Sequence, residues 1–319
     1  MGMILAVDGG NSKTALLVAT TDGEIVSTVR GPGTNPHAVG AEAVADVIGA
    51  LIAESGAPLP VDHAVFFLRG ADVPSDIDSL ERAIDGRGWA TARMVDNDTF
   101  ALLRAGTDAL DAVAVICGAG INVVGRAADG RVARYPSLGW ETGDWGGAKM
   151  LGREVLRVAA RAEDGRGDPT VLAQIVREHF GAPTVEAVGV DVHYKWIPES
   201  QLAELAPKVV AAAVDGDRVA WSLVERLADE IVLIAHRALR DLDLTEADVV
   251  LGGGMLESGE GLLYETVLAR LPDGTRAIAV PDPPVLGAGL AALDEAGATD
   301  DAKARLRGEL RAGASSASG

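Results

Sequence analysis

The chain has 319 residues, and its 28 Lys and Arg against 47 Asp and Glu give a net charge of −19 with neutral histidines. Hydrophobic residues make up 48% and charged residues 24%, which is typical of a globular protein long enough for two domains. An acidic surface repels nucleic-acid phosphates and anionic lipid head groups. Nucleic-acid and membrane binding are therefore disfavoured, and chemistry on small molecules is favoured.

A single cysteine, Cys117, excludes an internal disulfide, a multi-thiolate zinc site and an iron–sulfur cluster held by one chain. This usage fits a cytoplasmic protein. The first residues have no basic segment, and their apolar run ends at Asp8. We therefore expect a first strand there and neither a signal peptide nor a membrane anchor.

An internal repeat organises the sequence. Residues 4–31 consist of an apolar run, a glycine loop, a second apolar run, an Asp-Gly pair at 22–23 and a third run. Residues 112–135 repeat this order, with the Asp-Gly pair at 129–130. Because Asp-Gly between apolar segments is a strong hairpin signal, the repeat predicts two halves of similar architecture.

The other patterns predict strands and helices in alternation. In chain order we expect helix 37–55, strand 64–68, helix 76–85, strand 93–95, and helices 99–105, 148–161, 169–180, 201–214 and 218–242, then strands 249–251 and 277–280 and helix 285–296. This order predicts a mixed α/β protein of two lobes.

The expected lobe boundaries follow from these elements. Residues 1–106 form an N-terminal lobe, and residues 107–296 form a C-terminal lobe with helical insertions, whose last helix can pack back towards the first lobe. Residues 297–319 are charged and then rich in Ser, Ala and Gly, so we expect a flexible tail.

The first glycine loop lies between two predicted strands, unlike a Walker or Rossmann loop, which leads into a helix. Its residues are Asp8, Gly9, Gly10, Asn11, Ser12, Lys13 and Thr14. The glycines permit a tight turn close to a ligand, and the following side chains suit phosphate oxygens. The aspartate at the strand end suits Mg²⁺ held through water. An ordinary hairpin turn with a solvated lysine is the alternative.

Two further glycine segments follow predicted strands. Gly118-Ala119-Gly120 is the repeat-related partner of the first loop, and its backbone amides suit phosphate. Gly252-Gly253-Gly254 precedes a predicted helix, where a turn without side chains lets a base or ribose lie against the backbone. A simple strand-to-helix turn is the alternative for the last segment.

These three loops, followed by the segment Val-Leu-Gly-Ala-Gly-Leu-Ala-Ala at 285–292, resemble the actin–hexokinase–Hsp70 ATPase superfamily. They correspond to its phosphate 1, phosphate 2, adenosine and connecting-helix segments. Over residues 3–296 the chain is most similar to BadF-type ATPases and N-acetylglucosamine kinases. The resemblance implies a ribonuclease H-like α/β fold of the actin and hexokinase type, with ATP and a sugar in the interdomain cleft.

Asp96-Asn97-Asp98 lies where a short predicted strand meets a helix. Phosphoryl transfer to a hydroxyl needs a carboxylate that orients the hydroxyl and takes its proton. The resemblance implies a sugar contact for Asn97 and the catalytic base for Asp98, with Asp96 beside them. Capping of the following helix by either aspartate is the alternative.

The segment 138–148 resembles the sugar-binding loop of the family, and Asp144 takes the place of an aspartate that holds sugar hydroxyls. Trp140 and Glu141 lie beside it, giving an apolar face and acceptors suited to a pyranose. Tryptophans that only fill a domain interface are the alternative. Asp72 follows a strand at another part of the sugar cleft implied by the resemblance.

The chain departs from the family at several of these positions. Ala119 and Ile121 replace residues that carry hydroxyls, so phosphate binding at that loop must rest on backbone amides. Asp96, Glu141 and Asp144 offer carboxylates to a free ammonium group, which favours glucosamine over N-acetylglucosamine.

The sequence therefore predicts an ATP- and Mg²⁺-dependent kinase acting on the 6-hydroxyl of glucosamine, with N-acetylglucosamine or glucose as the alternative acceptor. A BadF-type activator is disfavoured, because such activators use more than one cysteine per chain for an iron–sulfur cluster. A sugar-sensing protein without catalysis or a scaffold is a further alternative. A homodimer is left open, and the aromatic segment 191–196 is interpreted as local packing rather than a lid or dimer contact.

Overall fold

The structure is a computed structural model that describes residues 2–316 and divides the chain into two compact units. Unit 1 comprises residues 1–114, 134–136 and 280–319, and unit 2 comprises residues 115–133 and 137–279. This division differs from the sequence-based boundaries at residues 106 and 296. The difference arises because the end of the chain packs with its beginning.

Unit 1 contains a five-stranded sheet in the order β3-β2-β1-β4-β5. The strands are β1 (Met3–Gly9), β2 (Lys13–Thr20), β3 (Ile25–Pro32), β4 (Val61–Leu68) and β5 (Ala90–Asn97). The first three form antiparallel pairs, whereas β1, β4 and β5 run parallel. The parallel strands therefore end at one common edge of the sheet.

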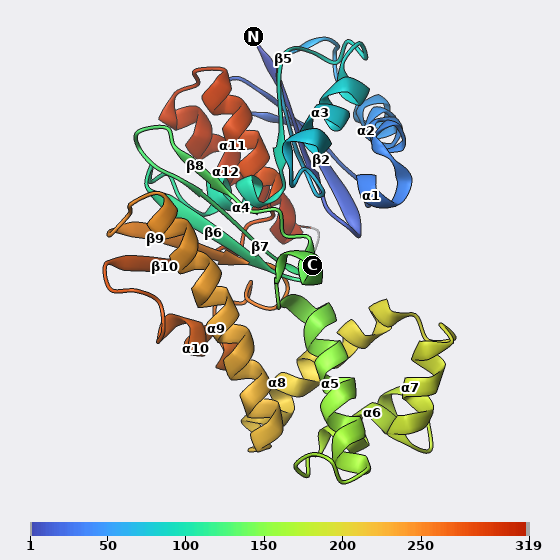
Figure 1. Cartoon of the computed structure of the whole chain (residues 1–319). Coiled ribbons are helices and arrows are strands. Elements are labelled where there is room, and N and C mark those ends of the chain that lie inside the picture. Colours follow the sequence, from blue (N-terminus) through green and yellow to red (C-terminus); the bar gives the residue numbers. More distant parts are fainter. Residues whose placement is uncertain (1, 317–319) are drawn as a thin grey trace. The chain divides into compact units, whose positions relative to one another are not determined.

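Helices cover both faces of this sheet, which explains why β1 is an almost continuous apolar run. Leu5 and Val7 pack in a core cluster with α2 (Ala41–Ser55) and α3 (Pro74–Ile84). Ile4 and Ala6 belong to a second core cluster, which includes residues of α11 (Val285–Glu295). The helix α11 lies on the opposite side of the sheet from α2 and α3 (Figure 1). The alternation of side chains along a strand thus divides the core of unit 1 into two layers.

The remaining helices of unit 1 are α1 (Pro36–Val39), α4 (Thr99–Gly106) and α12 (Asp300–Ser316). The helix expected at 37–55 is interrupted at Gly40, which has a φ of 86° and separates α1 from α2. Such a positive φ suits glycine because it has no side chain.

Unit 2 repeats the sheet of unit 1 with the order β10-β9-β6-β7-β8. Its strands are β6 (Ala112–Cys117), β7 (Ile121–Arg126), β8 (Val132–Arg134), β9 (Ala247–Gly252) and β10 (Thr275–Ala279). Read from the other edge, the order 8-7-6-9-10 matches 3-2-1-4-5 of unit 1. The expected α/β fold of two similar halves is confirmed.

A large helical insertion lies between β8 and β9. It contains η1 (Gly139–Thr142), α5 (Gly147–Glu163), α6 (Leu172–Phe180), α7 (Val185–His193), η2 (Glu199–Leu205), α8 (Ala206–Val214) and α9 (Arg218–Asp241), and α10 (Leu262–Leu268) follows β9. The sequence did not predict α7, and the expected helix 201–214 corresponds to η2 followed by α8. A helix was expected directly after Gly254, whereas α10 begins at Leu262.

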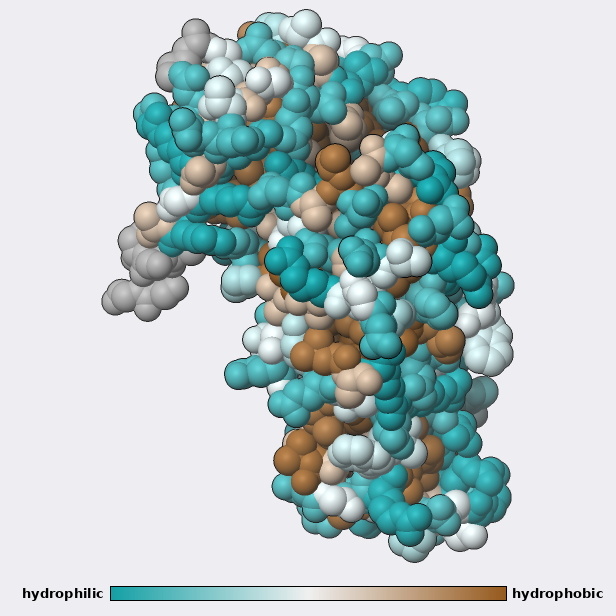
Figure 2. Space-filling model, turned by 90° about the vertical axis from the view of Figure 1, so that its left-hand side faces the viewer, coloured by the Kyte–Doolittle hydropathy of each residue, from teal (hydrophilic) through white to brown (hydrophobic). Residues whose placement is uncertain are grey.

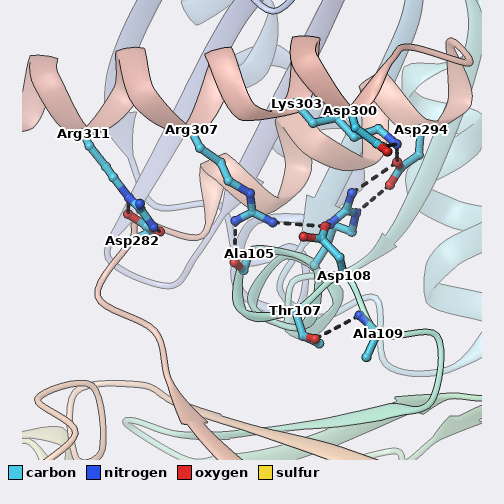
Figure 3. A network of polar contacts seen from close by, with 11 residues as sticks. Ala105, Thr107, Asp108, Ala109, Asp282, Asp294, Asp300, Lys303, Arg307 and Arg311 are labelled. Atoms are coloured by element: carbon cyan, nitrogen blue, oxygen red, sulfur yellow. Dashed lines mark hydrogen bonds and ion pairs between the residues drawn. The ribbon is translucent and has the colours of Figure 1, made fainter.

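The segment expected to be a flexible tail forms α12, which a polar network holds to α4 and α11 (Figure 3). Lys303 Nζ lies 2.8 Å from Asp294 Oδ1, and Arg307 donates to the backbone oxygen of Ala105 at 2.9 Å. Arg311 lies 2.7 Å from Asp282. The charged composition that suggested a solvated tail is therefore used in ion pairs with unit 1.

Hydrophilic residues cover much of the face shown in Figure 2, and hydrophobic residues form separate patches on it. Within residues 2–316, each helix is too short or too polar to cross a membrane.

Candidate functional site

Acidic residues gather at the edge of unit 1 where the three parallel strands end. Gly9 of β1 pairs with Leu68 of β4, which in turn pairs with Asn97 of β5. Asp8 precedes Gly9, and Asp98 follows Asn97 directly. The register therefore brings the predicted metal ligand and the predicted base to the same edge.

The carboxylate of Asp8 lies in a strongly perturbing environment. The pKa of Asp8 is raised from 3.8 to about 7, chiefly by burial and also by the negative charge of Asp98, whereas Lys13 opposes the shift. The charge of Asp98 thus disfavours ionisation of Asp8. Because the ionised form of Asp8 is disfavoured, binding of a proton or a metal cation is favoured at this edge.

Asp98 stands at the N-cap position of α4, but its side chain makes no capping hydrogen bond. The backbone N–H of Thr99 donates instead to Asn97 Oδ1 at 2.9 Å. Burial raises the pKa of Asp98 to about 6, while Arg69 lowers it and Asp72 raises it. Asn97 therefore takes the capping role, and the carboxylate of Asp98 makes no capping bond.

Asn97 is buried, with 4% of its surface exposed, and acts as a bridge. Its Nδ2 donates to Asp72 Oδ1 at 2.7 Å, while its Oδ1 holds the first turn of α4. Both residues were predicted as sugar contacts. That role stays a prediction; in this structure they connect the loop after β4 to the start of α4, and they fix the backbone on either side of Asp98.

Asp96 is engaged on the other side of the same turn. Its Oδ1 accepts from the backbone N–H of Asn97 at 2.7 Å, and its carboxylate forms an ion pair with Arg134. The Arg134 guanidinium also lies 4.7 Å from the ring centre of Phe100. The charge of Asp96 is therefore already matched, which weakens its predicted role towards an ammonium group.

The first glycine loop is a tight, largely exposed turn. Gly10 N–H donates to Lys13 O at 2.9 Å, and Gly10 O accepts from Thr34 N–H at 2.9 Å. A Cβ on Gly9 would lie 2.4 Å from Thr34 Oγ1, so only glycine fits there. The exposed residues of the turn are Asn11, Ser12 and Lys13.

Thr14 differs from its predicted role. Its side chain is fully buried, and its hydroxyl donates to Thr34 Oγ1 at 3.2 Å. The residue sits in β2 beside Gly9 in the strand register. It therefore supports the loop from behind rather than presenting its hydroxyl to a ligand.

The corresponding loop of unit 2, Gly118-Ala119-Gly120, is fixed against the start of α5. Ala148 N–H donates to Gly118 O at 2.7 Å, and Lys149 N–H donates to Ala119 O at 3.1 Å. Gly147 has a φ of 74°, and a Cβ there would lie 2.5 Å from the backbone of Gly120. Two of the free amides at the start of α5 are thus satisfied by the loop.

The third glycine segment lies against the second in unit 2. Gly253 has a φ of 85°, and a Cβ there would lie 2.7 Å from the backbone of Cys117. Met255 N–H donates to Cys117 O at 3.0 Å. A run of turns follows, and α10 begins only at Leu262, so the expected direct strand-to-helix transition is absent.

Cys117 carries no reactive thiolate at this position. Its side chain is buried, and burial raises the pKa of its thiol to about 12.

The predicted acceptor loop is closed by Asp144. Asp144 Oδ2 accepts from the Gly139 N–H at 3.2 Å and from the Thr142 hydroxyl. Trp140 is 74% exposed. Glu141 is exposed beside it. The loop therefore presents one indole and one carboxylate, while Asp144 holds its shape.

Trp145 behaves differently from Trp140. It is 6% exposed, and the Arg226 guanidinium lies 4.0 Å from its ring centre. Of the two tryptophans in the segment 138–148, Trp145 packs in the interior of unit 2, and Trp140 is exposed and accessible to a ligand.

The donor set around Asp8 fits Mg²⁺. Burial and the charge of Asp98 disfavour its ionised form, and a divalent cation would offset both effects. Within residues 2–316, no group of three or more His, Cys, Asp or Glu side chains forms a ready-made metal site. Mg²⁺ commonly binds through one or two carboxylates, water and substrate phosphates, which matches this arrangement.

Sequence comparison identifies a family with a matching fold. A model of the BadF/BadG/BcrA/BcrD ATPase family matches residues 5–292. An N-acetylmuramic acid/N-acetylglucosamine kinase of Clostridium acetobutylicum is 27% identical over 81% of this chain and 87% of its own length. An N-acetyl-D-glucosamine kinase of Dictyostelium discoideum is 23% identical over 92% and 98%, respectively.

Solved structures share the fold as well. A Chromobacterium violaceum protein described as a candidate N-acetylglucosamine kinase has a TM-score of 0.69 and 22% identity, covering 92% of this chain and 99% of its own. A ROK family glucokinase of Streptomyces griseus, crystallised with glucose and AMPPNP, has a TM-score of 0.54 and 19% identity, covering 92% and 100%. At these identities the likeness shows the fold alone.

Proposed function

We propose that this chain, which belongs to the BadF/BadG/BcrA/BcrD ATPase family, transfers the γ-phosphoryl group of ATP to the 6-hydroxyl of an amino sugar. The observation that carries the proposal is Asp98, a carboxylate at the start of α4 that makes no capping bond and whose pKa is raised to about 6. The names of two curated relatives, both kinases of N-acetylated amino sugars, support the substrate class.

The chemistry needs a base, together with groups that position the two substrates and offset the charge of the phosphates. Asp98 orients the acceptor hydroxyl and takes its proton as the oxygen attacks the γ-phosphorus. The bond to the β–γ bridging oxygen breaks, and ADP leaves. A pKa near 6 keeps Asp98 largely ionised at neutral pH while leaving it basic enough to accept the proton.

Glycine loops of each unit supply the nucleotide contacts in this proposal. In unit 1, the turn at residues 9–13 offers backbone amides and the exposed Lys13 ammonium to phosphate oxygens. Asp8 would hold Mg²⁺, which neutralises charge on the phosphates when bound. In unit 2, Gly118-Ala119-Gly120 and Gly252-Gly253-Gly254 offer backbone alone.

N-acetylglucosamine is the acceptor we place first. Asp96 is neutralised by Arg134, and Asp144 is occupied within its own loop, so two of the three carboxylates expected to attract an ammonium are engaged. Glucosamine is the second candidate, because Glu141 presents an exposed carboxylate beside Trp140.

A coupled ADP-release assay across N-acetylglucosamine, glucosamine and glucose, with and without Mg²⁺, tests the function. We expect sugar-dependent ADP release that requires Mg²⁺, with the highest kcat/KM on the N-acetylated sugar. Phosphorus NMR of the product should place the new ester at the 6-position. Sugar-independent ATP turnover in every arm would contradict the kinase function and favour an activator or scaffold ATPase.

A further inference from the structure

Arg69 lies between the first glycine loop and Asp98. It follows β4 directly, and β4 is the middle strand of the three that end at this edge. Its backbone N–H donates to Gly9 O at 2.7 Å. Because Gly9, Leu68 and Asn97 are aligned in the register, Arg69 is level with the start of the loop on one side and with Asp98 on the other.

The Arg69 guanidinium is not paired with a carboxylate. Throughout the described part of the chain, no hydrogen bond or ion pair joins it to a carboxylate, although it is partly buried. The nearby arginines differ, because Arg134 pairs with Asp96 and Arg104 pairs with Asp294. An arginine left without a partner in so acidic a chain is available to a ligand that is itself an anion.

Binding of an anionic ligand at this edge is favoured by a cation such as the Arg69 guanidinium, because carboxylates already gather there. Asp8, Asp72 and Asp98 bring three carboxylates to this edge. Besides Arg69, Lys13 acts on Asp8, and the cationic form of His37 acts on Asp72. ATP adds several negative charges, and charge moves across the γ-phosphoryl oxygens during transfer. The field of Arg69 already reaches two of these residues, since it lowers the pKa of both Asp72 and Asp98.

We propose that Arg69 is a further catalytic residue, whose guanidinium contacts the phosphoryl group during its transfer from ATP to the sugar. The proposal rests on the kinase function proposed above. Arg69 forms no covalent bond, because the acceptor oxygen forms the new bond to phosphorus, ADP takes the leaving electron pair and Asp98 takes the proton. The planar guanidinium binds the phosphoryl oxygens through two N–H groups and offsets their charge.

The test compares Arg69→Met and Arg69→Lys with the wild-type chain. Removing one charge-stabilising donor should lower kcat about 10²- to 10³-fold. The KM for the sugar should change by less than about threefold, since the contact is made in the transition state. Arg69→Lys should recover part of the loss, and added guanidinium should restore part of the activity of Arg69→Ala.

Arg82→Met is the matched control. Arg82 lies on the exposed surface of α3, where its guanidinium donates to Ser79, and its replacement should leave kcat unchanged. Circular dichroism and thermal unfolding verify that each variant is folded. Rescue by guanidinium keeps the test decisive even where the methionine variant loses stability, because a misfolded protein would not respond.

Two results would overturn the proposal. One is a kcat of Arg69→Met within about threefold of the wild type. The other is an unchanged maximal kcat with only a displaced acidic limb of the pH profile, which would show that Arg69 tunes Asp98 without touching the phosphoryl group. A wild-type chain inactive on every sugar would instead contradict the kinase function, so the two failures are distinguishable.

Discussion

The two glycine hairpins occupy the same place in two sheets of matching strand order, yet they carry different chemistry. In unit 1 the hairpin lies beside Asp8, Lys13 and, across the sheet edge, Asp98. In unit 2 the loop Gly118-Ala119-Gly120 carries no charge, and its shape depends on backbone contacts with α5. A duplicated scaffold has therefore kept its backbone turn in both copies but its charged side chains in one.

This difference separates two kinds of requirement. In the proposed function, the site in unit 1 depends on electrostatics, and we expect that a carboxylate there cannot be replaced by its amide. The proposed site in unit 2 depends on close backbone approach, and we expect a single added methyl group to be harmful there. Substitutions at matched positions test this division.

Asp98→Asn tests the charged site and should have the largest effect. The variant keeps the shape of the side chain but cannot accept a proton, so kcat should fall about 10³-fold. The KM for sugar and ATP should remain within a few-fold, as measured by steady-state ADP release. Asp85→Asn, at an exposed position after α3, is the control and should retain full activity. A kcat of Asp98→Asn near the wild-type level would show that Asp98 is not the catalytic base.

Trp145→Ala and Trp140→Ala test whether unit 2 contributes through packing. Trp145 is buried against Arg226, so its truncation should lower the free energy of unfolding by about 3 kcal/mol. The exposed Trp140 should leave stability unchanged and raise the KM for the sugar instead. Urea unfolding and steady-state kinetics measure both effects. Equal losses of stability in the two variants would show that Trp140 is also a packing residue.

Gly253→Ala and Gly254→Ala probe the backbone requirement in unit 2. Gly253 has a positive φ, and a Cβ there would meet the Cys117 backbone, whereas a Cβ on Gly254 meets nothing within 4 Å. Gly253→Ala should lower the free energy of unfolding by about 2 kcal/mol and raise the KM for ATP. Gly254→Ala should be within about 0.5 kcal/mol of the wild type. A larger loss of stability in Gly254→Ala than in Gly253→Ala would contradict the close approach of Gly253 to the Cys117 backbone.

Asp8→Asn tests the cost of burying charge in unit 1, through the pH dependence of stability in the absence of Mg²⁺. The pKa of Asp8 is raised to about 7 in the folded protein, so its burial favours the protonated form. The resulting contribution to stability is present below about pH 4 and is lost as the pH rises through 7. Relative to the wild type, Asp8→Asn should therefore gain up to about 4 kcal/mol at pH 8, since one pKa unit corresponds to about 1.4 kcal/mol, and little at pH 4.

Thermal unfolding of both proteins in EDTA at the two pH values measures this difference. Asp22→Asn in the exposed turn between β2 and β3 is the control, with no change expected. A destabilised Asp8→Asn at pH 8 would mean that the carboxylate is already compensated by the protein.

Local patterns in the sequence were enough to predict much of the fold. The Asp-Gly turns, the glycine loops and the strand ends at Asp8 and Asp98 are visible within short windows, and the repeat indicated two similar halves. The roles of Asp98 and the nucleotide loops stay predictions, but the register places Asp8 and Asp98 at one edge as the strand order required.

Contacts between side chains that lie far apart in the sequence could not be predicted from local patterns. Nothing local distinguishes the exposed Trp140 from the buried Trp145, because Trp145 packs against Arg226, which lies 81 positions further along the chain. Arg134 neutralises an aspartate 38 residues away. The helix α12 was missed for the same reason, since the partners of its charged residues lie on other elements of unit 1.

The discontinuity of unit 1 also determines when the protein can finish folding. During synthesis, the whole of unit 2 emerges before residues 280–316, which carry α11 and α12. Until then, the sheet face with Ile4 and Ala6 lacks the leucines of α11 that cover it. At about 5–20 residues per second, synthesis of residues 115–279 leaves this apolar face exposed for roughly 10–30 s. Premature termination before α11 should therefore yield aggregates that chaperones retain, even though every residue of the charged edge has been made.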